Sequence, residues 1–105
     1  MNKFTWEKDK GSNRNIWRCF LNSIEYEQLN IVRYSYEEVE SQFPRRLVKR
    51  CELLVRAIAL KKAVYEIWNC ADPVWFETLA EAKAFVKNEY GNTSIEELEW
   101  YREEV

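Results

Sequence analysis

The first third of the chain alternates between hydrophobic and polar positions with the two-residue period of a β-strand. Residues 3–8 place Phe4 and Trp6 on one face and polar side chains on the other, which is typical of a half-buried strand. Two further runs follow at 16–22 and 24–35, each after a polar turn segment. These three runs are therefore predicted to form an antiparallel meander.

Ser35 and Glu38 predict the start of the first helix. A Ser followed three residues later by Glu is the capping box, in which each side chain accepts a hydrogen bond from the other residue's backbone N–H. The helix should cover residues 36–43 and stop or kink at Pro44, because proline disfavours helical angles in the residue before it. Proline is also a favourable first residue of a helix, so a second helix is expected over 44–62.

The C-terminal half returns to strand character and then to helix. Residues 63–69 alternate, and residues 74–77 add one more short strand. Thr78 and Glu81 match a second capping box, and Gly91 is placed to end the helix that they begin. The core-facing positions of this helix recur every three or four residues, at Leu79, Ala82, Phe85 and Val86.

Residues 92–105 predict a short acidic helix at the C-terminal end, in which Ile95, Leu98 and Tyr101 recur at a spacing of three. Strands and helices that are grouped along the chain are typical of the α+β class. We therefore predict a single α+β domain over residues 1–105. Its antiparallel sheet should contain the N-terminal three-strand meander plus one or two later strands, with helices packed on one face.

The composition agrees with one ordered domain. The chain has 105 residues, only two glycines and two prolines, and 15% aromatic residues, whereas a disordered chain is poor in aromatics. No stretch approaches the roughly 20 apolar residues that a membrane span requires, and the N-terminal segment lacks the apolar core of a signal peptide. Three scattered cysteines without an export signal indicate a reducing compartment, so we expect a cytoplasmic protein.

The side chains that most enzymes use near neutral pH are missing. The chain has no histidine, which is the usual general base and the commonest metal ligand. Cys19, Cys51 and Cys70 lack the CxxC spacing of a structural zinc site. Gly11 and Gly91 are eighty residues apart, which excludes a glycine-rich phosphate loop. We therefore expect no enzymatic activity, no cofactor and no metal. Cys19 and Cys51 fall at predicted core positions, and Cys70 falls at a predicted turn.

Charge is concentrated in the predicted helix 44–62. This segment holds seven basic residues and one acidic residue, whereas residues 77–105 hold three basic and eight acidic residues. A helical projection places a core-facing stripe at Leu47, Cys51, Leu54, Val55 and Ile58. The remaining faces carry basic side chains with two leucines among them, at Arg45, Arg46, Lys49, Arg50, Leu53, Arg56 and Leu60. Leucines between arginines indicate that something covers this surface.

Three candidates fit this basic, leucine-bearing surface. The first is the acidic segment 93–105 of the same chain, whose apolar side chains would contact Leu53 and Leu60. The second is a partner protein with an acidic, partly apolar surface. The third is nucleic acid, which is the least favoured because phosphates gain little from leucines and because the chain carries a net charge of −2.

These features favour a small non-catalytic protein-binding module that acts as a stoichiometric inhibitor or modulator of a macromolecular partner. Phage-encoded inhibitors of bacterial defence systems and immunity proteins for toxins have this size and character. The alternative is a small nucleic-acid-binding regulator that uses the basic helix 44–62 and contacts its ligand through Arg45, Arg46, Lys49 and Arg50. The sequence leaves the partner's identity and the oligomeric state open.

Overall fold

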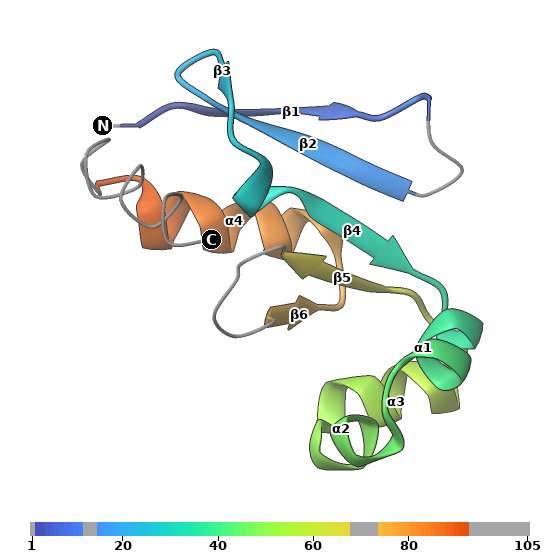
Figure 1. Cartoon of the computed structure of the whole chain (residues 1–105). Helices are drawn as coiled ribbons and strands as arrows, with labels where there is room; N and C mark the ends of the chain where they lie inside the picture. Colours follow the sequence, from blue (N-terminus) through green and yellow to red (C-terminus); the bar gives the residue numbers. More distant parts are fainter. Residues whose placement is uncertain (1, 12–14, 68–73, 93–105) are drawn as a thin grey trace.

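The computed structural model describes residues 2–11, 15–67 and 74–92 and shows a sheet with short helices at one end (Figure 1). The strands are β1 (Phe4–Lys8), β2 (Asn15–Leu21), β3 (Ile24–Glu25), β4 (Ile31–Tyr34), β5 (Val64–Ile67) and β6 (Val74–Phe76). The helices are the 3-10 helix η1 (Glu27–Leu29) and the α-helices α1 (Tyr36–Gln42), α2 (Arg45–Arg50), α3 (Glu52–Leu60) and α4 (Leu79–Tyr90). The predicted α+β class is confirmed.

The described strands pair in an antiparallel sheet with the order β1-β2-β4-β5-β6, and β3 lies beside the end of β2. Strands β1, β2 and β4 are the predicted N-terminal meander, and β5 and β6 are the two later strands. Strand β2 is seven residues long, so it accommodates both β3 and β4 on one side and β1 on the other. Strands β1 and β6 are therefore the two edges of this sheet.

The prediction of one continuous strand over 24–35 is wrong, because this segment contains β3, η1 and β4 in succession. Asn22 and Ser23 have positive φ angles of 51° and 72° and form the two-residue turn of the β2–β3 hairpin. The chain then leaves the sheet at η1. Asn30 compensates for this departure, since its buried side-chain oxygen accepts a 2.8 Å hydrogen bond from the backbone N–H of Cys19.

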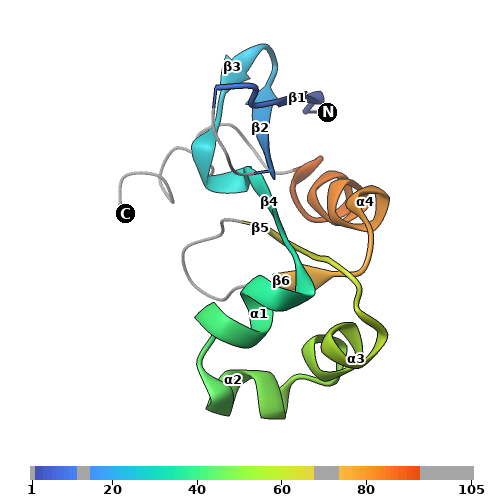
Figure 2. The same ribbon diagram turned by 90° about the vertical axis from the view of Figure 1, so that its right-hand side faces the viewer.

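The larger hydrophobic core lies between the sheet and α4. Its buried side chains are Cys19, Leu21, Tyr26, Leu29, Ile31, Ile67, Ala82 and Val86. Figure 2 shows α4 along one face of the sheet. The predicted core-facing positions of this helix are confirmed, since Ala82 and Val86 are fully buried and Leu79 and Phe85 pack against the same core.

A second, smaller core lies between the short helices and one end of the sheet. Its buried side chains are Val39, Leu54, Ala57 and Val64. On β5, Val64 belongs to this smaller core and Ile67 to the larger one. Because successive side chains of a strand point to opposite faces, the two cores lie on opposite faces of the sheet. Helix α4 packs on one face of the sheet, as expected. Helices α1, α2 and α3 gather at one end of the sheet (Figure 1).

The local signals for helix ends are confirmed. The Ser35 hydroxyl accepts a hydrogen bond from the backbone N–H of Glu38, and the Glu38 carboxylate accepts one from the backbone N–H of Ser35. The Thr78 hydroxyl accepts a 3.1 Å hydrogen bond from the backbone N–H of Glu81 at the start of α4. Helix α4 ends at Gly91, where a β-carbon would lie 2.3 Å from a backbone carbonyl oxygen of the preceding turn.

The prediction of one continuous helix over 44–62 is wrong, because the chain is extended at Cys51, with φ −111° and ψ 106°. This break turns α3 relative to α2. Leu47 of α2 and Leu53 of α3, which a continuous helix would separate, therefore both pack against the smaller core. Val55, predicted to face the core, is 47% exposed instead. Leu54 is buried as predicted.

Candidate partner-binding surface

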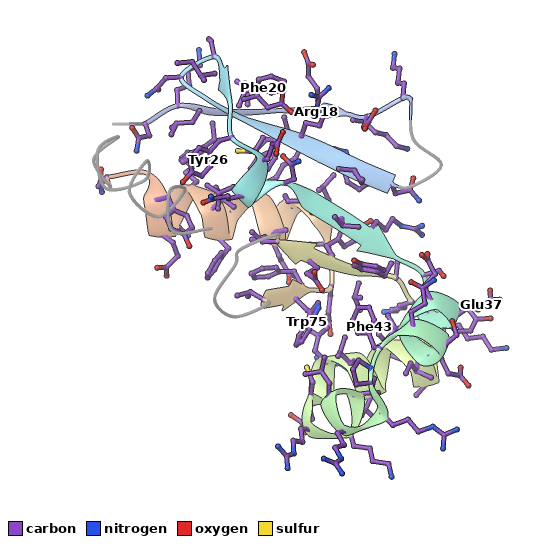
Figure 3. All side chains as sticks on the ribbon, viewed as in Figure 1. Arg18, Phe20, Tyr26, Glu37, Phe43 and Trp75 are labelled. Atoms are coloured by element: carbon purple, nitrogen blue, oxygen red, sulfur yellow. The ribbon has the colours of Figure 1, made fainter. Side chains whose placement is uncertain are left out.

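Helix α2 carries four exposed cations, Arg45, Arg46, Lys49 and Arg50, which we call the α2 basic cluster. Two half-buried side chains, Leu47 and Val48, anchor the helix against the smaller core. Among the residues that the structure describes, none of the four cations forms an ion pair. Figure 3 shows long nitrogen-tipped side chains that extend away from α2. Within the described part of the chain, all four are therefore exposed and without an acidic partner.

The α2 basic cluster contains pairs of like charges at helical spacing. Arg45 and Lys49 are four residues apart on one helix, and so are Arg46 and Arg50. Like charges at this spacing destabilise a helix by roughly 0.2–0.5 kcal/mol per pair. No described acidic side chain forms an ion pair with these cations. Such a surface is complementary to a ligand with negative charge.

The exposed face of α3 follows directly after this cluster. Its residues recur at helical spacing and are Glu52, Val55, Arg56, Ala59 and Leu60, which we call the α3 outer stripe. Leu60 is 55% exposed, as predicted. Leu53, predicted on the same face, lies at the edge of this stripe, where it is half-buried and packs against the smaller core.

Arg56 differs from the cations of α2, because it already has an acidic partner. Its guanidinium lies 2.6 Å from a carboxylate oxygen of Glu77, at the start of the connection between β6 and α4. An open hollow of about 310 Å³ lies beside this ion pair and is lined by Arg56, Ala57, Leu60, Lys62, Ala63 and Glu77. The lining of this hollow combines apolar side chains with charged groups of both signs.

The break at Cys51 explains why the sequence projection missed part of this surface. A projection of 44–62 as one helix carries the phase of α2 into α3, which misplaces Val55. A projection limited to residues 52–60 would have placed Glu52, Val55 and Arg56 on one outer face, because they are separated by three and four residues. The sequence does not mark the break with glycine or proline, so this limit was not visible.

The segment predicted to cover the basic helix, residues 93–105, lies outside the described residues. The predicted turn with Cys70 does so as well. The idea that the acidic segment contacts Leu53 and Leu60 therefore stays a prediction for both leucines, of which Leu53 is half-buried and Leu60 is exposed.

The described cysteines are positioned as hydrophobic side chains. Cys19 is buried in the larger core, and burial raises the pKa of its thiol to about 12, which keeps it protonated at neutral pH. Cys51 is half-buried against the smaller core. In the ranges 2–11, 15–67 and 74–92, no three acidic or cysteine side chains come together as a cation site.

The sheet face opposite α4 holds two polar pairs. Arg18 donates to a carboxylate oxygen of Glu25 from Nε at 2.8 Å, and this hydrogen bond and the charge of Glu25 raise the pKa of the guanidinium. Glu66 accepts a 2.7 Å hydrogen bond from the indole N–H of Trp75. Burial raises the pKa of the Glu66 carboxyl, and the Trp75 hydrogen bond lowers it by less.

Within the described ranges, no helix is both long enough and apolar enough to cross a membrane. Comparison of the chain with known protein families, with characterised proteins and with solved structures gives no significant match.

Proposed function

We propose that the protein is a non-catalytic binding module whose α2 basic cluster docks on an acidic, partly apolar surface of a partner protein. The observation that carries this proposal is the set of four cations on a six-residue helix without ion pairs among the described residues. The α3 outer stripe adds apolar contact through Val55 and Leu60. The absence of histidine supports a role without acid–base catalysis.

A protein partner is favoured over nucleic acid by the mixture of charge and apolar surface. Val55 and Leu60 expose about half of their surface on the same face of α3 as Arg56, and phosphates gain nothing from them. Glu52 lies between the α2 basic cluster and these two residues, where it would repel a phosphate backbone. Arginine beside exposed apolar residues is typical of protein interfaces.

The mode of action that follows is stoichiometric. A module of this size inhibits or modulates a partner by occupying its working surface. The cations would accelerate the encounter through long-range attraction, so association should slow as the salt concentration rises. The apolar contacts of α3 would instead lengthen the lifetime of the complex, and this effect depends little on salt.

A small nucleic-acid-binding regulator remains the second candidate, because α2 on its own presents only cations to solvent. Arg45, Arg46, Lys49 and Arg50 would then contact phosphates, and the affinity would fall with salt by a slope of about −0.9 per contact for duplex DNA. The half-burial of Leu53 against the smaller core weakens one of the arguments against this alternative.

Two surface variants separate these candidates. The first replaces Arg45, Arg46, Lys49 and Arg50 with Ser, and the second replaces Val55 and Leu60 with Ser. Lys10→Ser, at an exposed position away from both surfaces, is the control. Each protein serves as bait in a lysate that has or has not been treated with nuclease, and the retained molecules are quantified by mass spectrometry.

A protein that the wild type retains after nuclease treatment, and that both surface variants lose, supports the proposed function. Direct titration with a 20-base-pair duplex and a single-stranded RNA at 0.15 M salt completes the test. We expect dissociation constants weaker than about 10 μM, as for non-specific binding. Nanomolar, salt-dependent binding that only the α2 variant abolishes would assign the surface to nucleic acid instead.

A further inference from the structure

A groove runs between the edge strand β1 and helix α4, at the end of the molecule opposite α2. Both views place β1 far from α2 (Figures 1 and 2). The groove has a volume of about 420 Å³ and is lined by Asn2, Lys3, Phe4, Trp6, Lys83, Ala84 and Lys87. One of its ends is closed, because the backbone N–H and side-chain amide of Asn2 donate to the carbonyl oxygens of Gly91 and Tyr90, respectively.

The backbone of β1 has hydrogen-bonding groups that point away from β2, its partner among the described strands. In an antiparallel pair, residues that exchange backbone hydrogen bonds alternate with residues whose N–H and C=O groups point outward. The N–H of Asp9 donates to Ile16, and the C=O of Lys3 accepts from Asn22. Because this pattern repeats every two residues, the backbone N–H and C=O groups of Thr5 and Glu7 also point toward β2. The N–H and C=O groups of Phe4, Trp6 and Lys8 therefore point away from β2.

No second strand pairs with β1 in the described part of the chain. Such an edge has the geometry to pair with another extended segment. The length of β1, Phe4–Lys8, sets how many residues of a partner strand can pair with it. Its three outward-facing residues lie at every second position, so they span about five residues of a partner strand, or about 16 Å.

The groove also has a strong charge preference. Three of its lining residues are lysines, Lys3, Lys83 and Lys87, and none is acidic. None of these lysines forms an ion pair with another described residue. The charge disfavours pairing of β1 with β1 of a second copy, because that arrangement would bring lysines together. It favours an extended segment that carries carboxylates.

We propose that this groove binds an extended acidic peptide segment of another protein, which adds to the sheet as a strand beside β1. The peptide backbone would pair with Phe4, Trp6 and Lys8, while its carboxylates meet Lys3, Lys83 and Lys87. The aromatic side chains of Phe4 and Trp6, which are half-buried in the lining, would contact apolar side chains at alternate peptide positions. A free nucleotide or phosphate would use the lysines but not the outward-facing backbone groups, so those groups favour a peptide.

This site is separate from the α2 basic cluster, and neither proposal depends on the other. Substitutions in α2 should leave peptide binding in the groove unchanged, and substitutions in the groove should leave the α2-dependent partner unchanged. Failure of one proposal is therefore distinguishable from failure of the other.

The probe for the groove is a fluorescein-labelled eight-residue peptide that alternates Glu and Val, and its matched control alternates Lys and Val. Fluorescence anisotropy with the full chain should show half-saturation below 1 mM for the Glu peptide and at least tenfold weaker binding for the Lys peptide. Two further Glu peptides carry N-methyl groups on alternate amides, one set on the odd residues and one on the even residues. In a paired strand, only every second amide of the peptide points toward β1. Only the peptide that is methylated on those amides should therefore lose binding.

Hydrogen exchange followed by NMR locates the peptide on the wild-type chain. Saturation with the Glu peptide should slow exchange at the amides of Phe4, Trp6 and Lys8. It should change exchange at Thr5 and Glu7 little, because those amides already donate to β2.

Replacing Lys83 and Lys87 with Glu should weaken binding of the Glu peptide at least tenfold, since one exposed ion pair accounts for at most about a fivefold change. The matched variant with Arg at both positions should keep the affinity, and circular dichroism should show that both variants fold.

Several results would overturn the proposal. They are no binding of the Glu peptide at 1 mM, equal effects of the two methylated peptides, and protection that does not alternate along β1. Binding of adenosine triphosphate that requires the lysines, without any binding of the peptide, would assign the groove to small anions and would also overturn it.

Discussion

Leu54→Ala tests whether the smaller core contributes to the stability of the whole chain. Leu54 has no exposed surface and lies among Val39, Ala57 and Val64. The substitution removes three carbon atoms. At about 0.8 kcal/mol for each buried methylene-sized group, the loss of burial alone is roughly 2.4 kcal/mol.

The cavity that remains adds to this value. Buried Leu→Ala changes cost about 2–5 kcal/mol, and the cost is smaller where neighbours can relax into the space. The smaller core has few fully buried members and is bordered by half-buried side chains such as Leu53 and Ile58, so partial relaxation is expected. We therefore expect a decrease of about 3 kcal/mol in the free energy of unfolding. For a chain of 105 residues this corresponds to a decrease of upwards of 10 °C in Tm.

Leu60→Ala is the matched control, because it makes the same chemical change on the same helix at a side chain that is 55% exposed. It should change the free energy of unfolding by no more than about 0.5 kcal/mol. Urea titrations followed by far-ultraviolet circular dichroism give both values, and equal m-values are needed for the comparison. If the two variants lose equal stability, α3 does not pack as described.

A second pair of substitutions tests the break at Cys51. Leu53 packs against the smaller core and Val55 is 47% exposed, so Leu53→Ala should lower the free energy of unfolding more than Val55→Ala does. A continuous helix over 44–62 predicts the reverse order. The reverse order in the same urea titrations would therefore refute the break.

Three further predictions concern single polar positions. Lys61 ends α3 with a φ of 55°, so Lys61→Gly should raise the free energy of unfolding by about 0.5–1 kcal/mol; a decrease in urea titrations would contradict the left-handed cap. The Glu66 carboxyl has a pKa that burial raises, so it favours the folded state when protonated, and this contribution is lost as the pH rises through that pKa. Glu66→Gln should therefore raise Tm at pH 7 and have a smaller effect at pH 4, and a lower Tm at pH 7 would contradict this sign. Asn30→Ala removes the acceptor of the buried Cys19 N–H and should cost about 1–3 kcal/mol; a loss under 0.5 kcal/mol would show that another group satisfies this N–H.

The features that the sequence determined by itself are local ones. The capping box at Ser35 and the cap at Thr78 each involve a partner three residues away, so the residues that form each contact lie close together along the chain. The same holds for the turn at Asn22 and Ser23 and for the alternation of β2. Such contacts form between neighbours along the chain whatever the rest of the protein does, and this is why they could be predicted.

The surface of α3 was decided by the tertiary structure. Nothing in the local sequence interrupts the helical pattern at Cys51. The chain is extended there because the break brings apolar residues of both α2 and α3, Leu47 and Leu53 among them, to one core. Burial of the apolar residues of α2 and α3 offsets the loss of helical hydrogen bonds at the break. This burial depends on contacts with Val39 and Val64, which lie outside both helices in the sequence.

The groove beside β1 shows the same limit more strongly. Its lysines come from the first residues of the chain and from α4, about eighty positions later. Periodicity predicted both elements, and it predicted that Phe4 and Val86 each face a core. It contains no information about which edge of the sheet α4 lies beside, because that depends on the strand order and on the packing of α4 against the larger core. The sequence therefore determined β1 and α4 and their buried faces, while long-range packing decided where the helical segment 44–62 breaks and which charged residues became neighbours on the surface.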